Sequence, residues 1–472
     1  MNTTLNDLHS ELNPTEVVDV ITVNSLETIQ AGIKRARNLG VPVAVAGGRY
    51  AMGGQQFCHG GLVLDTKELN RILHFDNQRG LLEVEAGIQW PELIEYLEIK
   101  QAGLAYQWAI AQKQTGADRL SIGGTVSANA HGRGLKMKPF ISDIESLVIV
   151  DANAESIECS RLQNYELFSL VVGGYGLFGC IYSVKIRLTQ RQVLERIVEL
   201  GTIEDLIKRF DERISEGYLY GDFQFAIDPT SKDFLRKGVF SCYRPVERKQ
   251  LPPVNQRELS LNDWMHLITL AHTDKKLAFK LYSEHYLATS GQIYYSDRHQ
   301  LADYLDGYHR KLDKLIGTGE RATEVISELY VPRNLLSDFM LAAAEDFRTH
   351  NVDVIYGTVR LIESEEESFL AWADDSWACV IFNLHTLHTE DGIAHTTQAF
   401  RRLIDFAIER GGKYYLTYHR WATHEQVEKC YPQLREFLKL KQKYDPEQRF
   451  QSDWYRHYCD LLLDKKMDLF KS

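Results

Sequence analysis

Residues 47–55 read Gly47-Gly48-Arg49-Tyr50-Ala51-Met52-Gly53-Gly54-Gln55, and this loop decides how the first part of the chain is interpreted. It directly follows an apolar run at residues 41–46, Val-Pro-Val-Ala-Val-Ala, which predicts a buried strand. Its two glycine pairs allow consecutive backbone N–H groups to face one anion without obstruction by side chains. The alternative is a tight connection between a strand and a helix, and the loop by itself does not separate the two interpretations.

A second run of small residues, at 121–132, favours the ligand-binding interpretation. It reads Ser-Ile-Gly-Gly-Thr-Val-Ser-Ala-Asn-Ala and closes with His131-Gly132. Small side chains let a large planar ligand lie against the backbone, and two glycine-rich loops in one region carry an entropic cost that a purely structural account leaves unexplained. The two runs therefore predict binding sites for opposite ends of one long cofactor.

A third glycine cluster, at residues 173–179, formally contains the GxGxxG pattern at Gly174, Gly176 and Gly179. A dinucleotide-binding turn of that type follows a strand and opens a helix, so that the pyrophosphate meets the helix N-terminus. Here helical spacing precedes the cluster at 167–172, and an alternating apolar strand follows it at 181–188. We therefore reject a nicotinamide dinucleotide site of the Rossmann type.

Composition limits the classes of protein that fit. The chain has 472 residues, of which 44% are hydrophobic, so it is long and apolar enough to bury a sizeable core. Its 54 Lys and Arg against 65 Asp and Glu give a net charge of -11, which argues against nucleic acid as a partner. A phosphate-bearing ligand must then be held by backbone N–H groups in glycine turns.

Cysteine usage and hydropathy predict the compartment. The seven cysteines are scattered without a CxxC pair, which fits free thiols in a reducing compartment. No stretch approaches the ~20 apolar residues that span a bilayer, and the N-terminus lacks a signal-peptide pattern. We expect a cytoplasmic protein without an integral membrane segment.

The order of the strand and helix patterns predicts an α+β chain with a boundary near residue 190. Strand patterns at 17–23, 41–46, 62–65, 72–75, 81–86, 144–150 and 181–188 accompany helical spacing at 26–36 and 90–98. Beyond about residue 192 the glycine clusters stop, and strands at 221–227, 352–359 and 378–384 accompany helices at 335–348 and 394–410. Three segments are expected, 14–190, 191–424 and 425–472.

The three glycine-containing motifs, in this order, resemble the FAD-binding domain of the vanillyl-alcohol oxidase / p-cresol methylhydroxylase (PCMH-type) flavoprotein family. The run Tyr444-Asp445-Pro446 with Arg449-Phe450 is similar to that family's C-terminal return to the FAD domain. The combination looks most like the aldonolactone/alditol oxidase and decaprenylphosphoryl-ribose oxidase branch. It implies a two-subdomain FAD-binding domain, 14–190, a mixed α/β cap domain with an antiparallel sheet, 191–424, and a returning segment, 425–472.

The resemblance also implies which residues contact FAD. The first loop would surround the pyrophosphate, the second run would lie along the pyrophosphate and the isoalloxazine ring, and the third would lie near the adenosine half. The expected FAD-binding residues are Gly47, Gly48, Arg49, Tyr50, Ala51, Met52, Gly53, Gly54, Gln55, Thr115, Gly116, Ser121, Ile122, Gly123, Gly124, Ser127, Asn129, His131, Gly132, Gly176, Gly179 and Ile181.

One position departs from the family. Many members attach FAD covalently through a histidine in the first loop, where this chain has Tyr50. A tyrosine lacks the imidazole nitrogen that forms the usual bond, and the second run has no cysteine for a sulfur link. We expect FAD to be bound non-covalently, with Tyr50 stacking or packing instead.

Candidate catalytic residues come from the second segment, because the cap domain supplies the substrate side in this family. They are Glu328, Arg360, Asn383, His385, Tyr418 and His419. Glu328 is expected near a strand end, where a solvated carboxylate is the more common outcome. Asn383 and His385 share one strand face by period two, so a satisfied core pair is an equal alternative. Tyr418 stands where sugar-oxidising relatives often carry a lysine, and either Tyr418 or the adjacent His419 would serve as a base if its pKa is shifted.

The main hypothesis is an FAD-dependent oxidoreductase that takes a hydride from the C–OH carbon of a small polyol, sugar, lactone or hydroxy acid. Oxygen or another electron acceptor would reoxidise the cofactor. Two alternatives stay open: a reductase or epimerase half-reaction on a lipid-linked sugar, and a binding protein of this fold without catalysis. A metal site at His385, His388 and His395 is disfavoured because the spacing lacks carboxylate or cysteine support, so no metal is expected.

Overall fold

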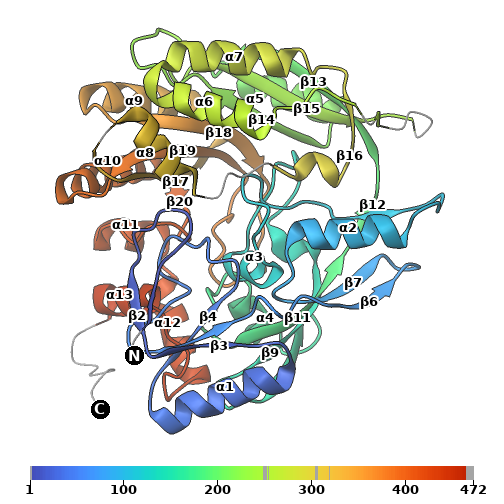
Figure 1. Ribbon diagram of the computed structural model, residues 1–472, viewed down its shortest axis with the longest axis vertical. Coiled ribbons are helices and arrows are strands. Elements are labelled where there is room, and N and C mark those ends of the chain that lie inside the picture. The colour runs from blue at the N-terminus through green and yellow to red at the C-terminus, as the bar shows by residue number, and fades with distance from the viewer. Residues whose placement is uncertain (1–2, 248–251, 254, 303–306, 318, 464–472) are drawn as a thin grey trace.

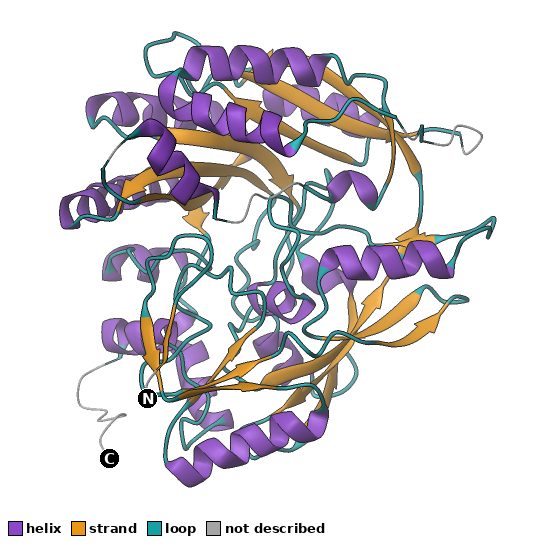
Figure 2. Cartoon of the chain, viewed as in Figure 1, coloured by secondary structure: helices purple, strands orange, loops and turns teal. Residues whose placement is uncertain are grey.

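The chain forms two tiers of sheet. The computed structural model describes residues 3–247, 252–253, 255–302, 307–317 and 319–463. A three-stranded and a five-stranded sheet occupy the lower tier in Figure 1, and one eight-stranded sheet fills the upper tier. Helices lie mainly on the outer sides of these sheets (Figure 2). Among the described residues, no helix is both long and apolar enough to cross a membrane.

The three-stranded sheet carries the first glycine loop. Its order is β3 (Asp19–Thr22), β5 (Leu62–Asp65), β4 (Val43–Ala46), and both pairings are parallel. Helix α1 (Leu26–Leu39) connects β3 to β4; it begins at the Ser25 cap and ends at Gly40 in the left-handed conformation, as the sequence predicts. The apolar strand β4 therefore delivers the chain directly into residues 47–55.

The five-stranded sheet is antiparallel and carries the other two glycine motifs. Its order is β10 (Ser156–Ser160), β9 (Ile144–Val150), β11 (Cys180–Arg187), β7 (Leu81–Glu85), β6 (Ile72–Asp76). Helices α2 (Trp90–Lys100) and α4 (Tyr165–Val171) occur where helical spacing was expected. Helix α3 (Ile122–Ala128) is additional: the Ser121 side chain accepts a hydrogen bond from the Gly124 N–H, so the small-residue run begins as a capped helix.

The upper tier is one antiparallel sheet of eight strands. Its order is β16 (Ile293–Tyr295), β13 (Val193–Thr202), β15 (Lys237–Pro245), β14 (Tyr220–Phe225), β18 (Val354–Ile362), β19 (Trp377–Leu387), β17 (Ala322–Pro332), β20 (Lys413–Tyr414). The covering helices are α5 (Leu206–Ser215), α6 (Leu261–Thr273), α7 (Lys275–Leu287), α8 (Tyr308–Ile316), α9 (Leu336–Thr349) and α10 (Glu390–Glu409). Helices α9 and α10 pack on β17, and α6 and α7 pack on β18 and β13.

The C-terminal helices return to the lower tier, where Figure 1 shows them in red beside the blue N-terminal strands. They are α11 (His424–Cys430), α12 (Leu434–Tyr444) and α13 (Asp453–Leu462). Between α12 and α13, Phe450 lies parallel to Val43 of β4, and the Val43 N–H donates to the Arg449 carbonyl at 2.7 Å. The segment between α12 and α13 therefore extends the edge of the sheet that carries the first glycine loop.

Residues 3–13 also belong to the packed structure, although the sequence led us to begin the first segment at residue 14. Strand β1 (Thr3–Leu5) pairs with β2 (Thr15–Val17). The Asn13 amide donates to the Met52 carbonyl at 2.8 Å, and the Thr323 hydroxyl donates to the Ser10 carbonyl at 2.9 Å. This N-terminal stretch thus contacts both the first glycine loop and strand β17 of the upper sheet. A last short pair, β8 (Trp108–Ala109) with β12 (Thr189–Gln190), leads into the upper tier.

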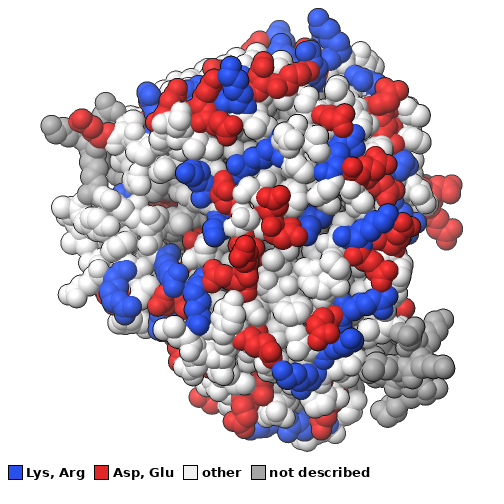
Figure 3. All heavy atoms as spheres, turned by 180° about the vertical axis from the view of Figure 1, so that it is seen from behind, with Lys and Arg blue, Asp and Glu red and all other residues white. Residues whose placement is uncertain are grey.

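Charge and cysteine placement agree with the sequence. On the face in Figure 3, Lys and Arg are interspersed with Asp and Glu, so this face carries no continuous basic surface. All seven cysteines are buried free thiols. The segment boundaries at 190 and 424 stay predictions, and residues 464–472 of the third segment lie outside the described chain.

A buried ion pair at the C-terminal return offers a test of the fold. The Lys441 ammonium lies 2.7 Å from Asp445, and the two side chains are 0% and 3% exposed. Asp445 also accepts from the Arg449 and Phe450 N–H groups. We expect Asp445→Asn to lower the free energy of unfolding in urea by about 3–5 kcal/mol, because Lys441 is left buried without its counter-charge.

The double variant Asp445→Asn with Lys441→Met is expected to recover much of that loss, since no buried charge remains. Glu425→Gln serves as the control: it breaks an exposed pair with Lys429 and is expected to leave the unfolding curve unchanged. Asp445→Asn with wild-type stability would contradict the role given to this pair.

Candidate active site

A cavity of about 950 Å³ lies between the glycine loops of the lower tier and one face of the upper sheet. Ordinary ligand pockets span roughly 300–1,000 Å³, so this cavity is at the large end and has room for an extended molecule. Of the residues predicted to bind a cofactor, those lining it are Gly47, Gly48, Arg49, Tyr50, Ala51, Met52, Gln55, Thr115, Gly116, Ser121, Gly123, Gly124, Ser127, His131, Gly176, Gly179 and Ile181.

The first two glycine motifs touch each other at the cavity wall. A Cβ added to Gly47 would lie 2.2 Å from the Ser121 hydroxyl oxygen, and one added to Gly48 would lie 2.5 Å from the Arg119 carbonyl oxygen. Glycine is required at both positions by this close approach, because any side chain would separate the loops. By contrast, Gly116 and Gly176 have positive φ (98° and 76°) and no neighbouring atom within 4 Å of such a Cβ, so they leave open space along the backbone.

Five residues predicted to bind cofactor lie outside the cavity lining. Gly53 and Gly54 pack instead against the Tyr418 carbonyl and the Arg420 guanidinium, and Gly132 packs against the Lys113 carbonyl. Ile122 points into the hydrophobic core. Asn129 ends helix α3 in the left-handed conformation. Its side-chain NH₂ group donates to Glu365 at 3.1 Å, and its side-chain oxygen accepts from the Ile141 N–H at 2.9 Å. These residues pack on the side of the loops that faces away from the cavity.

Glu328 is the centre of a buried hydrogen-bond network in the cavity wall. The sequence placed it near a solvated strand end, but it lies within the long strand β17 and is 2% exposed. Its Oε1 lies 2.6 Å from His131 Nε2 and accepts from the Tyr330 hydroxyl at 2.7 Å and the Cys379 thiol at 3.3 Å. Its Oε2 accepts from the Tyr418 hydroxyl at 2.8 Å. One carboxylate thus joins a residue of the second glycine motif to three residues of the upper sheet and its following loop.

His131 faces an acceptor on both sides of its ring. Nδ1 lies 3.0 Å from the Gly132 carbonyl oxygen, and Nε2 faces the Glu328 carboxylate. The ring is thus held between a backbone carbonyl and the Glu328 carboxylate. Burial would raise the pKa of Glu328, but the charge of His131 and the hydrogen bonds from His131, Tyr330 and Tyr418 outweigh it and lower that pKa to about 2.

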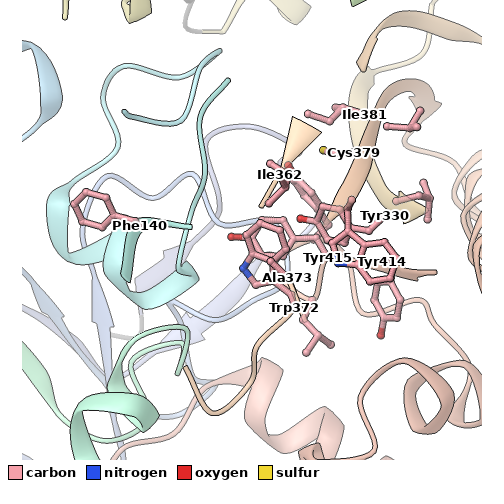
Figure 4. Packing of buried hydrophobic residues seen from close by; sticks show 14 of the residues in the cluster. Phe140, Tyr330, Ile362, Trp372, Ala373, Cys379, Ile381, Tyr414 and Tyr415 are labelled. Atoms are coloured by element: carbon pink, nitrogen blue, oxygen red, sulfur yellow. The ribbon is translucent and has the colours of Figure 1, made fainter. Parts of the chain in front are cut away.

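An aromatic wall stands behind this network. Figure 4 shows Tyr330, Trp372 and Tyr415 gathered beside Cys379. The Tyr330 and Trp372 rings stack with centroids 4.7 Å apart, and Trp372 and Tyr415 lie 5.0 Å apart. The Trp372 indole N–H donates to the Asn129 carbonyl at 3.0 Å. The wall therefore fixes the Tyr330 hydroxyl toward Glu328 and ties the upper sheet to the end of helix α3.

Four of the six predicted catalytic residues line the cavity, and two do not. Glu328, Arg360, Asn383 and Tyr418 line it. The His419 side chain is not part of the cavity lining, and its ring stacks on Trp421 with centroids 4.3 Å apart. Burial lowers the pKa of His419 to about 4. His385 lies behind the wall with its Nδ1 3.9 Å from the buried carboxylate of Glu324.

The structure changes the roles expected for Tyr418 and for the three closely spaced histidines. Burial and the charge of Glu328 raise the pKa of Tyr418 well above its usual range, so its phenol stays protonated and is a donor rather than a ready base. Of the three closely spaced histidines, His388 bonds Thr323 at 2.9 Å and His395 bonds the His350 carbonyl at 2.8 Å, so the three rings make separate contacts.

The cavity has a polar floor on the upper sheet that was not predicted from the sequence. Arg133, Asp222, Gln224, Ser241 and Thr358 all line it. A signal existed for two of them, since Asp222 and Gln224 alternate with phenylalanines in β14 and so share one face by period two. Nothing local in the sequence marks Arg133, because only the long-range approach of the second glycine motif to β14 brings it there.

Comparison with known proteins agrees with this geometry. The family model described as FAD binding domain matches residues 19–160, and the model described as D-arabinono-1,4-lactone oxidase matches residues 328–458. The first match contains the two interlocked glycine motifs, and the second contains Glu328 and Tyr418. In its FAD-binding domain, its fold and its oxidoreductase class, the chain is similar to the PCMH-type FAD-dependent oxidoreductases.

Relatives of this flavoenzyme cover nearly its whole length. Decaprenylphosphoryl-beta-D-ribose oxidase of Mycolicibacterium smegmatis is 24% identical over 458 residues, which are 93% of this chain and 94% of the relative. L-gulono-1,4-lactone dehydrogenase of Mycobacterium tuberculosis is 21% identical over 400 residues, 84% of this chain and 86% of the relative. The crystal structure of 6-hydroxy-D-nicotine oxidase from Arthrobacter nicotinovorans superposes with a TM-score of 0.59 at 14% identity, over 92% of this chain and 90% of the other. These comparisons confirm the α+β PCMH-type fold and the oxidoreductase class that the motifs predicted.

The residues of this flavoenzyme fit FAD. The bare backbone at Gly116 and Gly176 leaves space for a ligand along both loops, and the Arg49 guanidinium at the cavity edge is held by Asp65 at 2.6 Å. The N-terminus of helix α3, at Ser121, also borders the cavity and adds a partial positive charge suited to a pyrophosphate. The chain is negatively charged overall, but its glycine loops, the Arg49 guanidinium and the start of helix α3 suit an anion.

The low pKa of Glu328 makes the stability of this flavoenzyme pH-dependent. Because the pKa in the folded protein, about 2, lies below the usual value of 4.5, the carboxylate stabilises the fold above pH 4.5, and this contribution falls as the pH drops toward 2. We expect the wild-type free energy of unfolding, relative to Glu328→Gln, to decrease by roughly 3 kcal/mol over this window. Urea titrations of both proteins from about pH 6 to about pH 2 measure it. Parallel pH curves for the two proteins would contradict the ionised network.

Proposed function

We propose that this FAD-dependent oxidoreductase oxidises the C–OH carbon of a small polyol, sugar, lactone or hydroxy acid. The observation that carries the proposal is the position of Glu328: it lies in the cavity wall and is hydrogen-bonded to Tyr418 on the sheet side and to His131 on the glycine-loop side. A substrate placed between the loops and the sheet would meet an ionised carboxylate and a protonated phenol at one point.

The glycine loops would hold the cofactor. The loop side of the cavity is lined by residues that are proposed to bind FAD: residues 47–52, Ser121, Gly123, Gly124, Thr125, Ser127, Gly176, Gly179 and Ile181. When bound, FAD accepts two electrons and a proton equivalent as hydride from the substrate carbon. The contribution of the protein is to position that carbon and to accept the hydroxyl proton.

Tyr418 and Glu328 are proposed to take this proton together. The Tyr418 hydroxyl donates to Glu328 Oε2, so its oxygen keeps lone pairs for a substrate hydroxyl. As the C–O bond gains double-bond character, the hydroxyl becomes strongly acidic. Its proton passes to the Tyr418 oxygen while the Tyr418 proton passes to Glu328, so a weak base suffices. His131 is a positioning residue that keeps the carboxylate ionised until that transfer.

Two further cavity residues are proposed to orient the substrate. Asn383 lies on β19 opposite Tyr356 of β18, and Arg360 lies on β18 opposite Cys379. Asn383 reaches the cavity from β19, the strand next to β17, and Arg360 reaches it from β18, one strand further along. Oxygen or another electron acceptor is proposed to reoxidise the cofactor, and the seven buried thiols support a reducing, cytoplasmic location.

A lipid-linked sugar is the second candidate substrate. Helices α6 and α7 contribute an apolar part of the cavity lining: Trp264, Leu267, Ile268, Ala271 and Phe279. The similarity to decaprenylphosphoryl-beta-D-ribose oxidase supports the same candidate. Reduction of the flavin by a prenyl-linked sugar, with no reduction by free polyols, would favour it over the first.

Removal of the Tyr418 hydroxyl tests the proton path. We expect Tyr418→Phe to slow anaerobic flavin reduction by a true substrate about 10²–10⁴-fold, because the hydroxyl proton then has no relay to Glu328. Stopped-flow loss of the flavin's visible absorbance measures the rate. Tyr444→Phe is the matched control, since it deletes a hydroxyl that donates to Glu166 on the surface at 2.6 Å. Equal reduction rates for Tyr418→Phe and wild type would remove the proposed role.

The non-covalent binding mode is tested by denaturation. Tyr50 lines the cavity at the position where many family members carry the linking histidine. Precipitation of the holoenzyme with acid is expected to leave all yellow colour in the supernatant, because no bond joins the flavin to the chain. Colour that stays with the washed pellet would show a covalent link and overturn this proposal.

A further inference from the structure

Arg360 is a buried cation without a partner. It is 6% exposed and lines the cavity, yet its guanidinium makes no hydrogen bond or ion pair to any residue that the structure describes. A buried charge without a counter-charge is strongly unfavourable, and buried arginines are normally paired. Arg360 is therefore able to pair with an anionic group of a ligand in the cavity.

The other buried charged groups of the cavity wall already have partners. Arg133 lies 3.4 Å from Asp222, and Glu328 lies 2.6 Å from His131. Arg196 donates to the Tyr243 hydroxyl at 2.8 Å and lies over the tyrosine rings at 4.8–5.3 Å. Among the described residues, Arg360 differs from these groups because its guanidinium has neither a hydrogen bond nor an ion pair.

The neighbours of Arg360 also present unused polar atoms. Thr358 lies opposite Gln224 on the neighbouring strand, and Asp222, two residues from Gln224, lies opposite Ser241. Arg360 is two residues from Thr358, so all of these side chains lie on one face of the sheet. The Thr358 and Ser241 hydroxyls, one oxygen of Asp222 and the Nε atoms of Arg133 and Arg360 are buried without a hydrogen-bond partner among the described residues. Buried polar atoms in this number indicate a ligand that supplies the missing bonds.

We propose that the substrate carries a carboxylate or phosphate group that binds Arg360, next to hydroxyl groups that bind Thr358, Ser241 and Asp222. This inference rests on the proposed oxidation at Glu328 and names the class of substrate as an anionic polyhydroxyl compound. A guanidinium binds a planar or tetrahedral oxyanion through two parallel N–H bonds, which fixes orientation as well as position.

The strand order places the proposed anionic group of the substrate away from the carbon that is oxidised. Arg360 lies on β18 and Glu328 on β17, with β19 between them. Neighbouring strands are about 4.8 Å apart, so the two backbones are about 10 Å apart across the sheet. Both side chains reach into the shared cavity, and the substrate spans the space between them. The anionic group is therefore several bonds from the oxidised carbon.

Ligand titrations of the holoenzyme test this assignment, with the change in flavin absorbance as the readout. The probes are D-gluconate and D-ribose 5-phosphate as anions and D-glucitol as the neutral polyol. We expect Arg360→Gln to weaken binding of the anions about tenfold to hundredfold and to change binding of D-glucitol by less than about threefold. Arg360→Lys should retain part of the anion affinity. Arg35→Gln, which removes an exposed positive charge far from the cavity, should behave as wild type.

The thermal stability of the ligand-free holoenzyme gives a second readout. Removing an unpaired buried charge is expected to leave Tm unchanged or to raise it, whereas a structural arginine would lower Tm on replacement by glutamine. Farnesylphosphoryl-D-ribose distinguishes the source of the anion. Tighter Arg360-dependent binding than D-ribose 5-phosphate assigns the group to a lipid-linked substrate, and equal or weaker binding assigns it to a free sugar acid or phosphate.

Three results would overturn the inference. These are no binding of any anion, equal loss of anion and D-glucitol binding in Arg360→Gln, or a shift of the flavin potential in Arg360→Gln without a change in anion affinity, which would assign the arginine to the cofactor. The proposed function fails separately: Arg360-dependent anion binding, with no flavin reduction by any alcohol, retains the anion site and rejects the oxidation.

Discussion

The carboxylate of Glu328 has to remain ionised inside a wall of aromatic rings, and much of the local architecture follows from that constraint. Removing a carboxylate from water is costly unless donors replace the lost hydration. Four donors converge on it, and they come from separate parts of the chain: His131 after helix α3, Tyr330 on its own strand, Cys379 on β19 and Tyr418 after β20. The glycine loops and the upper sheet are thus held in register by a group that also faces the cavity.

This arrangement explains how an acidic protein holds anionic ligands. The net charge of -11 opposes a phosphate at long range. Inside the cavity the sign is different, because bare glycine backbone, the start of α3 and the guanidiniums of Arg49, Arg133 and Arg360 face inward. Short-range donors in a site shielded from water outweigh the weak field of distant, solvated carboxylates.

The sequence predicted much of the fold because its strands and caps are local. The apolar runs at 62–65 and 144–150 are the observed strands β5 and β9, and the Ser25 and Gly40 signals bound α1. Helix α3 was not predicted, since Gly123 and Gly124 have low helix propensity and only the Ser121 cap and packing against Ala86 support it. Local patterns describe elements well, but they carry little information on packing between them.

Prediction of the candidate site was limited by the same distinction. Glycine clusters and a family resemblance were enough to find the loop side. On the sheet side, adjacent residues diverge: Tyr418 faces Glu328, while His419 stacks on Trp421. Period-two spacing put Asn383 and His385 on one face, yet only Asn383 lines the cavity. Which of two adjacent residues faces the cavity depends on contacts with residues far away in the chain. Local sequence patterns do not reveal these contacts.

The contact between Gly47 and Ser121 also bears on how the site is assembled during folding. These residues are far apart in the chain, and the space between them admits no additional Cβ. Neither loop has its final shape until the other is in place, so the cofactor site is absent from any partly folded chain in which the two lower sheets have not yet met. Loop closure over this separation is slow compared with the formation of α1 or a hairpin. The complete cofactor site therefore requires this long-range contact as well as the local elements on either side of it.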